Sequence, residues 1–68
     1  MKTYDTSALE MMDRTATIGI MAASRLTGLA VAEISRMIKL GKLATKTIPG
    51  KAKPEVVAGD LLDMIRIS

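Results

Sequence analysis

The sequence predicts a mainly α-helical domain that also contains a small β-hairpin. Apolar residues recur at helical spacing on both sides of Gly28, a Pro-Gly pair at 49–50 separates two β-tolerant runs, and a last apolar helical stripe follows. With 68 residues the chain is long enough for one domain, but such a small domain buries little surface. We therefore expect it to associate with itself or with another molecule.

The composition excludes several classes of site. The chain has no cysteine and no histidine, which excludes disulfides, thiolate metal sites and the usual zinc sites. No set of catalytic acid, base or nucleophile is recognisable, and Asp60 and Asp63 read as solvent-facing charges of a helix. The longest apolar run, 18–23, is too short to span a membrane, and the N-terminus lacks a signal-peptide pattern. We expect a cytoplasmic protein that is not an enzyme and that has no cofactor, metal, membrane or small-molecule partner.

The charges are unevenly distributed. Residues 14–53 contain eight lysines and arginines against the single acidic residue Glu33, whereas both flanking segments are mildly acidic. Such a basic middle favours a polyanionic partner, because lysine and arginine side chains that neutralise phosphates release counterions. A solvated basic face without a partner is the alternative.

Residues 1–16 are expected to form an N-terminal extension. Within it, Ser7 and Glu10 have the spacing of a capping box, in which the serine hydroxyl accepts from the Glu10 amide and the glutamate carboxylate reaches back. This pattern predicts a short helix over 8–14, with Leu9 in its apolar stripe. A frayed terminus is the alternative, since chain ends are ordered only where something holds them.

The main domain, 17–68, is expected to begin with a helix over 18–26 for which Thr17 is the N-cap. Gly28 can adopt the positive φ that often ends a helix, so the chain is expected to turn there. The apolar stripe of this first helix would consist of Ile18, Met21, Ala22 and Leu26.

A second helix is expected over 30–40, ended by Gly41. Its apolar stripe would contain Ile34, Met37 and Ile38. Two helices joined at a tight turn are typical of a helix-turn-helix, whose second helix enters the major groove of DNA. The face opposite the stripe, which would then point at the bases, carries Ala32, Ser35, Arg36 and Lys39.

The following segment predicts a hairpin. Runs at 43–48 and 51–57 are β-tolerant, the Pro-Gly pair between them is a turn signal, and Pro54 confines the second strand to an edge or shortens it to 55–57. Two strands around a basic tip form a wing, which completes a winged helix-turn-helix. Gly59 or Asp60 is expected to cap a closing helix that packs on the helix pair through Leu61, Leu62, Met64 and Ile65.

Arg36 is the first candidate for DNA contact, because a guanidinium can form two parallel hydrogen bonds with guanine O6 and N7. The alternative is a surface arginine paired with Glu33. Lys39 and Lys42 lie where the helix would leave the groove, which favours phosphate contact over base contact. A favourable interaction of both lysines with the helix macrodipole is the alternative.

The hairpin lysines have ammonium groups suited to phosphate contact, or they protect an edge strand from pairing with other chains. They are Lys46, Lys51 and Lys53. The remaining candidates for DNA contact are Ser35, Thr27, Ala32 and Arg25. The start of the second helix offers only apolar contacts, such as contact with a thymine methyl group, through Ala30, Val31 and Ala32. One subunit is therefore expected to select its DNA site poorly.

Two segments carry a family resemblance. Residues 26–29 (LTGL) followed by 34–44 (ISRMIKLGKLA) resemble the "LxG, six or so residues, RRMIxxGKLP" pattern of small phage excisionases and Cox-type regulators of temperate phages. Residues 17–19 (TIG) are similar to the opening of the DNA-binding domain of MerR regulators. The spacing from Gly28 to Gly41 matches without a gap. The chain departs from the pattern at Ala44, where the family usually has proline.

The resemblance implies a MerR-like or excisionase-like winged helix-turn-helix in which Ser35, Arg36 and Lys39 face DNA and the 49–51 turn is the wing tip. It implies double-stranded DNA binding as a phage excisionase, a transcriptional regulator or repressor, or both, in the cytoplasm of a bacterial host. An excisionase would shape DNA for recombination by an integrase. We expect several subunits to bind repeated sites cooperatively. The alternative is a protein-interaction module, such as a small inhibitor or antirepressor, on the same scaffold.

Overall fold

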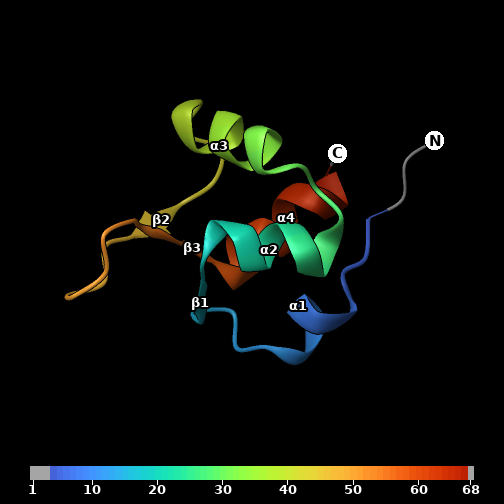
Figure 1. Cartoon of the computed structure of the whole chain (residues 1–68). Helices are drawn as coiled ribbons and strands as arrows, with labels where there is room; N and C mark the ends of the chain where they lie inside the picture. The colour runs from blue at the N-terminus through green and yellow to red at the C-terminus, as the bar shows by residue number, and fades with distance from the viewer. Residues whose placement is uncertain (1–3, 68) are drawn as a thin grey trace.

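The computed structural model describes residues 4–67. This part of the chain contains four helices and a three-stranded antiparallel sheet (Figure 1). The prediction of a mainly helical domain is confirmed, but the sheet is larger than the predicted hairpin. Among the described residues, no helix combines the length and the apolar character needed to cross a membrane. The elements are α1 (Ser7–Met11), β1 (Thr17–Ile18), α2 (Ile20–Thr27), α3 (Val31–Lys39), β2 (Thr45–Lys46), β3 (Glu55–Val57) and α4 (Ala58–Ile67).

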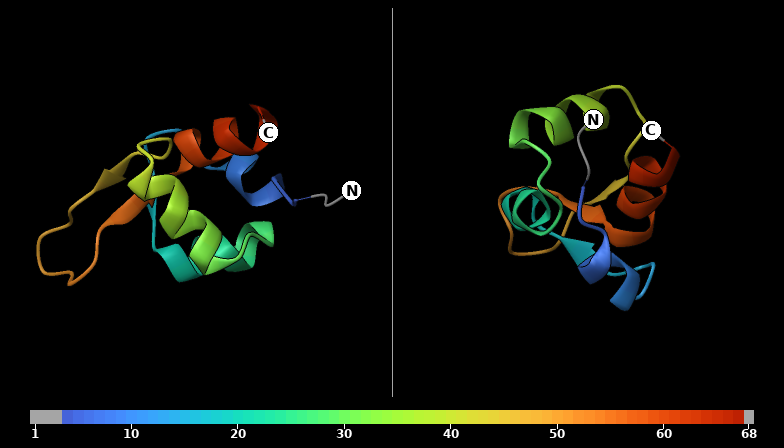
Figure 2. Two further views of the ribbon diagram at one scale, coloured as in Figure 1. Left: turned by 90° about the horizontal axis from the view of Figure 1, so that it is seen from above. Right: turned by 90° about the vertical axis from the view of Figure 1, so that its right-hand side faces the viewer.

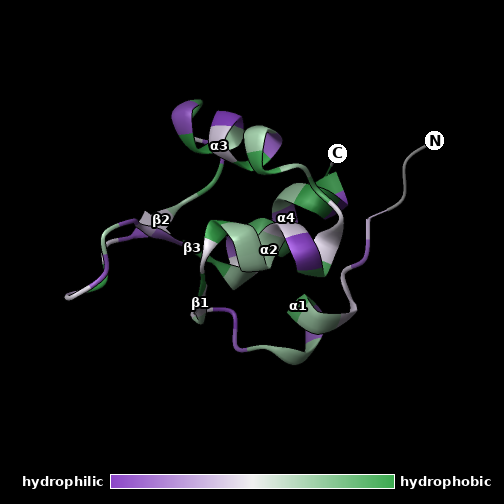
Figure 3. Cartoon of the chain, in the orientation of Figure 1, coloured by the Kyte–Doolittle hydropathy of each residue, from purple (hydrophilic) through white to green (hydrophobic). Residues whose placement is uncertain are grey.

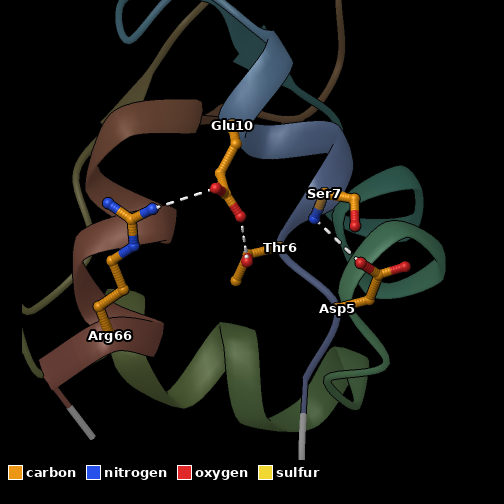
Figure 4. A network of polar contacts seen from close by, with 5 residues as sticks. All are labelled: Asp5, Thr6, Ser7, Glu10 and Arg66. Atoms are coloured by element: carbon orange, nitrogen blue, oxygen red, sulfur yellow. Dashed lines mark hydrogen bonds and ion pairs between the residues drawn. The ribbon is translucent and has the colours of Figure 1, made fainter.

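Polar contacts hold the start of α1 (Figure 4). The Asp5 carboxylate accepts a hydrogen bond from the Ser7 amide (N–Oδ1 2.9 Å), and the Thr6 hydroxyl donates to the Glu10 carboxylate (2.7 Å). The Ser7 amide, and after it the Ser7 hydroxyl, lowers the pKa of Asp5, because both groups stabilise the charged carboxylate. The predicted capping box is wrong, since Ser7 lies within the helix and Asp5 is the residue that accepts at its N-terminus. The helix also ends earlier than predicted, at Met11.

The N-terminal segment packs against α4. Leu9 is buried in the hydrophobic core. Glu10 forms an ion pair with Arg66 at 3.4 Å, drawn in Figure 4, and Arg14 forms one with Asp63. A frayed terminus therefore does not describe this part of the extension, because an apolar anchor and two ion pairs hold it.

The sheet has β3 at its centre, with β1 and β2 antiparallel on either side. Thr17 pairs with Val57 and Ile18 pairs with Val56. The sequence predicted β2 and the shortened β3 but made Thr17 the N-cap and Ile18 the first residue of the following helix, which is wrong. Both residues are extended because they form ladder hydrogen bonds with β3, and Gly19 takes the N-cap position of α2.

The inner face of α2 differs from the predicted stripe. Ala23 and Thr27 are buried, whereas Met21 and Ala22 are exposed. Because Ile18 belongs to β1 and α2 begins at Ile20, a stripe counted from Ile18 is out of phase with the helix. The correction moves Met21 and Ala22 from the core to the surface.

The turn between α2 and α3 and the end of α3 follow the prediction. Gly28 has a φ of 84°, and its amide donates to the Ser24 carbonyl at 2.8 Å. Gly41 has a φ of 74° just after α3. Ile34 is fully buried, and the rest of the predicted stripe, Met37 and Ile38, packs against the core.

Helix α4 continues directly from β3. The amides of Ala58 and Gly59 donate to the carbonyls of Ala16 (2.8 Å) and Arg14 (2.9 Å). The prediction that Gly59 or Asp60 caps this helix is wrong, because α4 already begins at Ala58 and backbone carbonyls of the N-terminal segment satisfy its first amides. The predicted apolar stripe is confirmed, with Leu61 and Leu62 buried and Met64 and Ile65 packed against the core.

Candidate nucleic-acid interface

The outer face of α3 presents the residues that the sequence selected for DNA contact. Because Ile34 points into the core, residues on the opposite side of the helix point to solvent. Ala32, Arg36 and Lys39 are exposed, and Ser35 is half-buried. Figure 3 shows hydrophilic turns on the side of α3 that faces away from α2 and α4.

Arg36 is paired within its own helix. Its guanidinium lies 3.4 Å from the carboxylate of Glu33, one turn earlier. Both side chains are exposed, at 64% and 39%, and an exposed pair of this kind contributes at most about 1 kcal/mol. The guanidinium can therefore exchange Glu33 for a phosphate or a base at little cost.

The connection between β2 and β3 protrudes from the body of the molecule (Figures 1 and 2). Its tip is a tight turn in which the Lys51 amide donates to the Ile48 carbonyl at 3.0 Å. Pro49 precedes Gly50, whose φ is 84°, as a type II turn requires. The hairpin carries three exposed lysines, Lys46 on β2 and Lys51 and Lys53 on the connection.

Glu55 introduces one negative charge among these lysines. Its carboxylate pairs with the Lys51 ammonium at 3.1 Å, and Lys46 is its partner across the sheet. Hydrogen bonds from the side chains of Lys51 and then Thr17 lower the pKa of Glu55, because both donors stabilise the charged form. The carboxylate therefore remains ionised at neutral pH and partly neutralises the hairpin.

A groove of about 480 Å³ lies between the hairpin, the start of α2 and the outer side of α3. It brings together three of the predicted residues, Ser35 from α3 and Lys51 and Lys53 from the hairpin. Its other lining residues are mostly apolar. They are Gly19, Ile20, Met21, Ala22, Val31 and Glu55.

Other predicted residues lie elsewhere. Thr27 is buried, and its hydroxyl donates to the Ala23 carbonyl (2.7 Å) and accepts from the Leu29 amide (3.2 Å). The prediction that Thr27 contacts DNA is therefore wrong, and its role is to stabilise the turn. Arg25 is exposed on α2, but it does not line the groove. Lys42 is exposed and lines a different groove with Met37, Met64 and Ile67.

The sequence placed one residue of the groove lining, Met21, in the core, although it is 65% exposed. Val31, which was named among the apolar residues that could contact a base, is 42% exposed and lines the groove as well. Recognising Thr17–Ile18 as a strand would have shifted the phase of α2 and moved Met21 outward.

The described residues contain no group of three or more acidic, histidine or cysteine side chains that could hold a metal ion. Comparison with models of protein families, with curated proteins and with solved structures finds no match to this chain.

Proposed function

We propose that the chain is a winged helix-turn-helix protein that binds double-stranded DNA. In this proposal α2 and α3 are the helix-turn-helix, α3 enters the major groove, and the β2–β3 hairpin is the wing. The groove that joins Ser35 of α3 to Lys51 and Lys53 of the hairpin is the observation that carries the proposal. A helix face and a basic hairpin on the two sides of one groove are suited to hold one strand of a duplex between them.

Charge and exposure support DNA binding by α3 and the hairpin. Arg36, Lys39, Lys46 and Lys53 are exposed there, and basic residues outnumber the two acidic ones, Glu33 and Glu55, which pair with Arg36 and Lys51. Phosphates bound there would release counterions, which is the main source of affinity in protein–DNA complexes. Arg36 is the residue best suited to contact a base, through guanine O6 and N7.

The limited set of base-reading groups supports a role in which several copies bind together. With Arg36 and Ser35 as the main polar groups on the central part of α3, one subunit would discriminate weakly between sites. We therefore propose that several copies bind repeated sites cooperatively, as a phage excisionase working with an integrase or as a transcriptional regulator in a bacterial cytoplasm. A gel-shift titration on DNA with repeated sites should give successive complexes that form cooperatively. A single one-to-one complex would contradict this part of the proposal.

Salt dependence tests DNA binding itself. The logarithm of the association constant, measured by fluorescence anisotropy with a labelled duplex, should fall linearly with the logarithm of salt concentration. Lys53→Gln should reduce the magnitude of that slope by about 1, the value for one lost phosphate contact. The matched control is Arg66→Gln, which removes one positive charge on the side of α1 and should leave the slope nearly unchanged. Equal slopes for the wild type and both variants would contradict phosphate binding by the hairpin.

A second function, binding of a partner protein, is favoured by the exposed apolar side chains near the other groove. Leu40 is 57% exposed at the end of α3, and Ile67 is 86% exposed beside Met37 and Met64. An inhibitor or antirepressor that used such an apolar surface would bind its partner almost independently of salt. The same titrations therefore distinguish the two functions.

A further inference from the structure

Apolar side chains at the start of α3 lie in or beside the groove that the hairpin lysines also line. Val31 is 42% exposed and lines the groove together with Lys51 and Lys53. The next residue, Ala32, is also exposed, and neither side chain carries a hydrogen-bonding group. The hydrophobic core does not account for these two positions, since Ile34 forms the buried part of this helix.

The part of the groove lining that comes from α2 is apolar too. Met21 of α2 is 65% exposed and lines the groove, with Ile20 and Ala22 beside it. Val31 and Met21 thus line the same groove as the ammonium groups of Lys51 and Lys53, of which Lys51 is paired with the Glu55 carboxylate. A ligand that matches this groove has to present an apolar group near a negative charge.

Double-stranded DNA presents such a pair of groups in its major groove. The C5 methyl group of thymine is the apolar group at the base edges there, and the phosphates of the same strand lie along the rim. Lys51 and Lys53 provide the charge complementarity for the phosphates, and Val31 provides the apolar contact. Cytosine offers an amino donor and no methyl group, and neither Val31 nor Met21 has an oxygen that could accept from that donor.

We propose that Val31, supported by Met21, is a specificity-determining residue that recognises the C5 methyl group of thymine. This inference rests on the proposed function, because it requires α3 to lie in the major groove. It assigns sequence preference to an apolar contact at the start of α3, in addition to the guanidinium of Arg36. The chain would then prefer sites in which thymine faces the first turn of α3.

The test uses two short duplexes, one of alternating dA and dT and one of alternating dA and dU, measured by fluorescence anisotropy. The two duplexes have the same phosphates and the same hydrogen bonds between paired bases, and they differ only in the C5 methyl group. Wild-type protein should bind the dU duplex about fourfold more weakly for each methyl group contacted, the value for one buried carbon. Val31→Ala should bind both duplexes with nearly equal affinity, and Met21→Ala should reduce the difference.

The matched control is Lys53→Gln, which should weaken binding of both duplexes and keep their affinity ratio. Val31 is exposed, so the alanine variant should keep its fold, and thermal unfolding checks this directly. Equal wild-type affinities for the two duplexes would overturn the inference and leave DNA binding intact. A ratio that persists in both Val31→Ala and Met21→Ala would overturn it as well, because the preference would then come from DNA shape. Failure to bind these two duplexes alone would overturn the inference, and failure to bind a guanine-containing duplex as well would overturn the proposed function.

Discussion

The two faces of α3 differ in what surrounds their side chains. On the inner face, Ile34 is fully buried in the core cluster. On the outer face, Val31 and Arg36 are exposed, and the ion pair of Arg36 is with Glu33 of the same helix. The residues that stabilise the fold are thus separate from those proposed to bind DNA. Substitutions on the inner face should therefore change the free energy of unfolding, and those on the outer face should change DNA affinity.

The largest effect is expected from Ile34→Ala. Removing a fully buried isoleucine side chain leaves a cavity and should lower the free energy of unfolding by about 2–5 kcal/mol. Val31→Ala, on the outer face of the same helix, should change it by about 0.5 kcal/mol or less. Urea denaturation followed by circular dichroism measures both values. Similar losses for the two variants would contradict the division of α3 into a core face and a free face.

The next largest effect is expected from Gly59→Ala at the start of α4. A Cβ atom there would lie 2.8 Å from the Arg14 carbonyl oxygen and 2.9 Å from the Arg14 Cβ, so the N-terminal segment would have to move. Such overpacking should lower the free energy of unfolding by about 1–3 kcal/mol.

The matched control is Gly19→Ala, where a Cβ atom meets nothing within 4 Å. It should change the free energy of unfolding by less than about 0.5 kcal/mol, since the N-cap preference for glycine and the entropy of the unfolded chain act in opposite directions. A Gly59→Ala protein as stable as the Gly19→Ala protein would show that the N-terminal segment is not tightly packed on α4.

The features of the fold that the sequence could predict are those decided by neighbouring residues. Ile34 lies in a stripe of large apolar residues with helical spacing, and Gly28 and Gly41 stand where positive φ is needed, so α3 and its turns were predictable. The Pro49-Gly50 turn was predictable for the same local reason. In each of these places, the information lies within a few residues along the chain.

The errors occur where distant residues decide the structure. Thr17 and Ile18 form a strand because β3, far along the chain, pairs with them, and two residues are too few to show a period. Thr27 is a local exception: it looked like a polar surface residue, but its hydroxyl is used by backbone groups of its own turn. Leu9 was predicted to lie in an apolar stripe, but the sequence did not show that α1 packs against α4. The groove was also not predictable, since it needs the relative positions of α2, α3 and the hairpin.

On the outer face, Arg36→Ala should weaken DNA binding by about 1–3 kcal/mol if the guanidinium contacts a guanine, with little change in stability. Arg66→Ala is the matched control, because this arginine also pairs with a glutamate but lies on α4 beside α1. It should leave DNA affinity nearly unchanged. Fluorescence anisotropy with one duplex compares the three proteins. Equal losses of affinity for both variants would mean that net charge, and not the outer face of α3, determines binding.

The smallest effect is expected from Glu55→Gln, which should raise DNA affinity and lower stability. It removes the negative charge beside Lys51 in the groove, so DNA affinity at low salt should rise about twofold. Glu10→Gln is the matched control, because Glu10 lies on α1 and should not affect DNA affinity. An unchanged affinity for Glu55→Gln would show that phosphate does not approach this part of the groove.

The same substitution should also change how stability depends on pH. The pKa of Glu55 is lowered from its ordinary value of 4.5 in the folded chain, so this carboxylate contributes stability above that value. The contribution is lost as pH falls through the lowered folded-state pKa. Wild-type protein should therefore lose more unfolding free energy than Glu55→Gln between neutral pH and about pH 3. Equal losses of unfolding free energy for the two proteins in urea denaturation would show that the Lys51–Glu55 ion pair contributes no net stability. A gain in DNA affinity for Glu55→Gln would then come only from the change of charge in the groove.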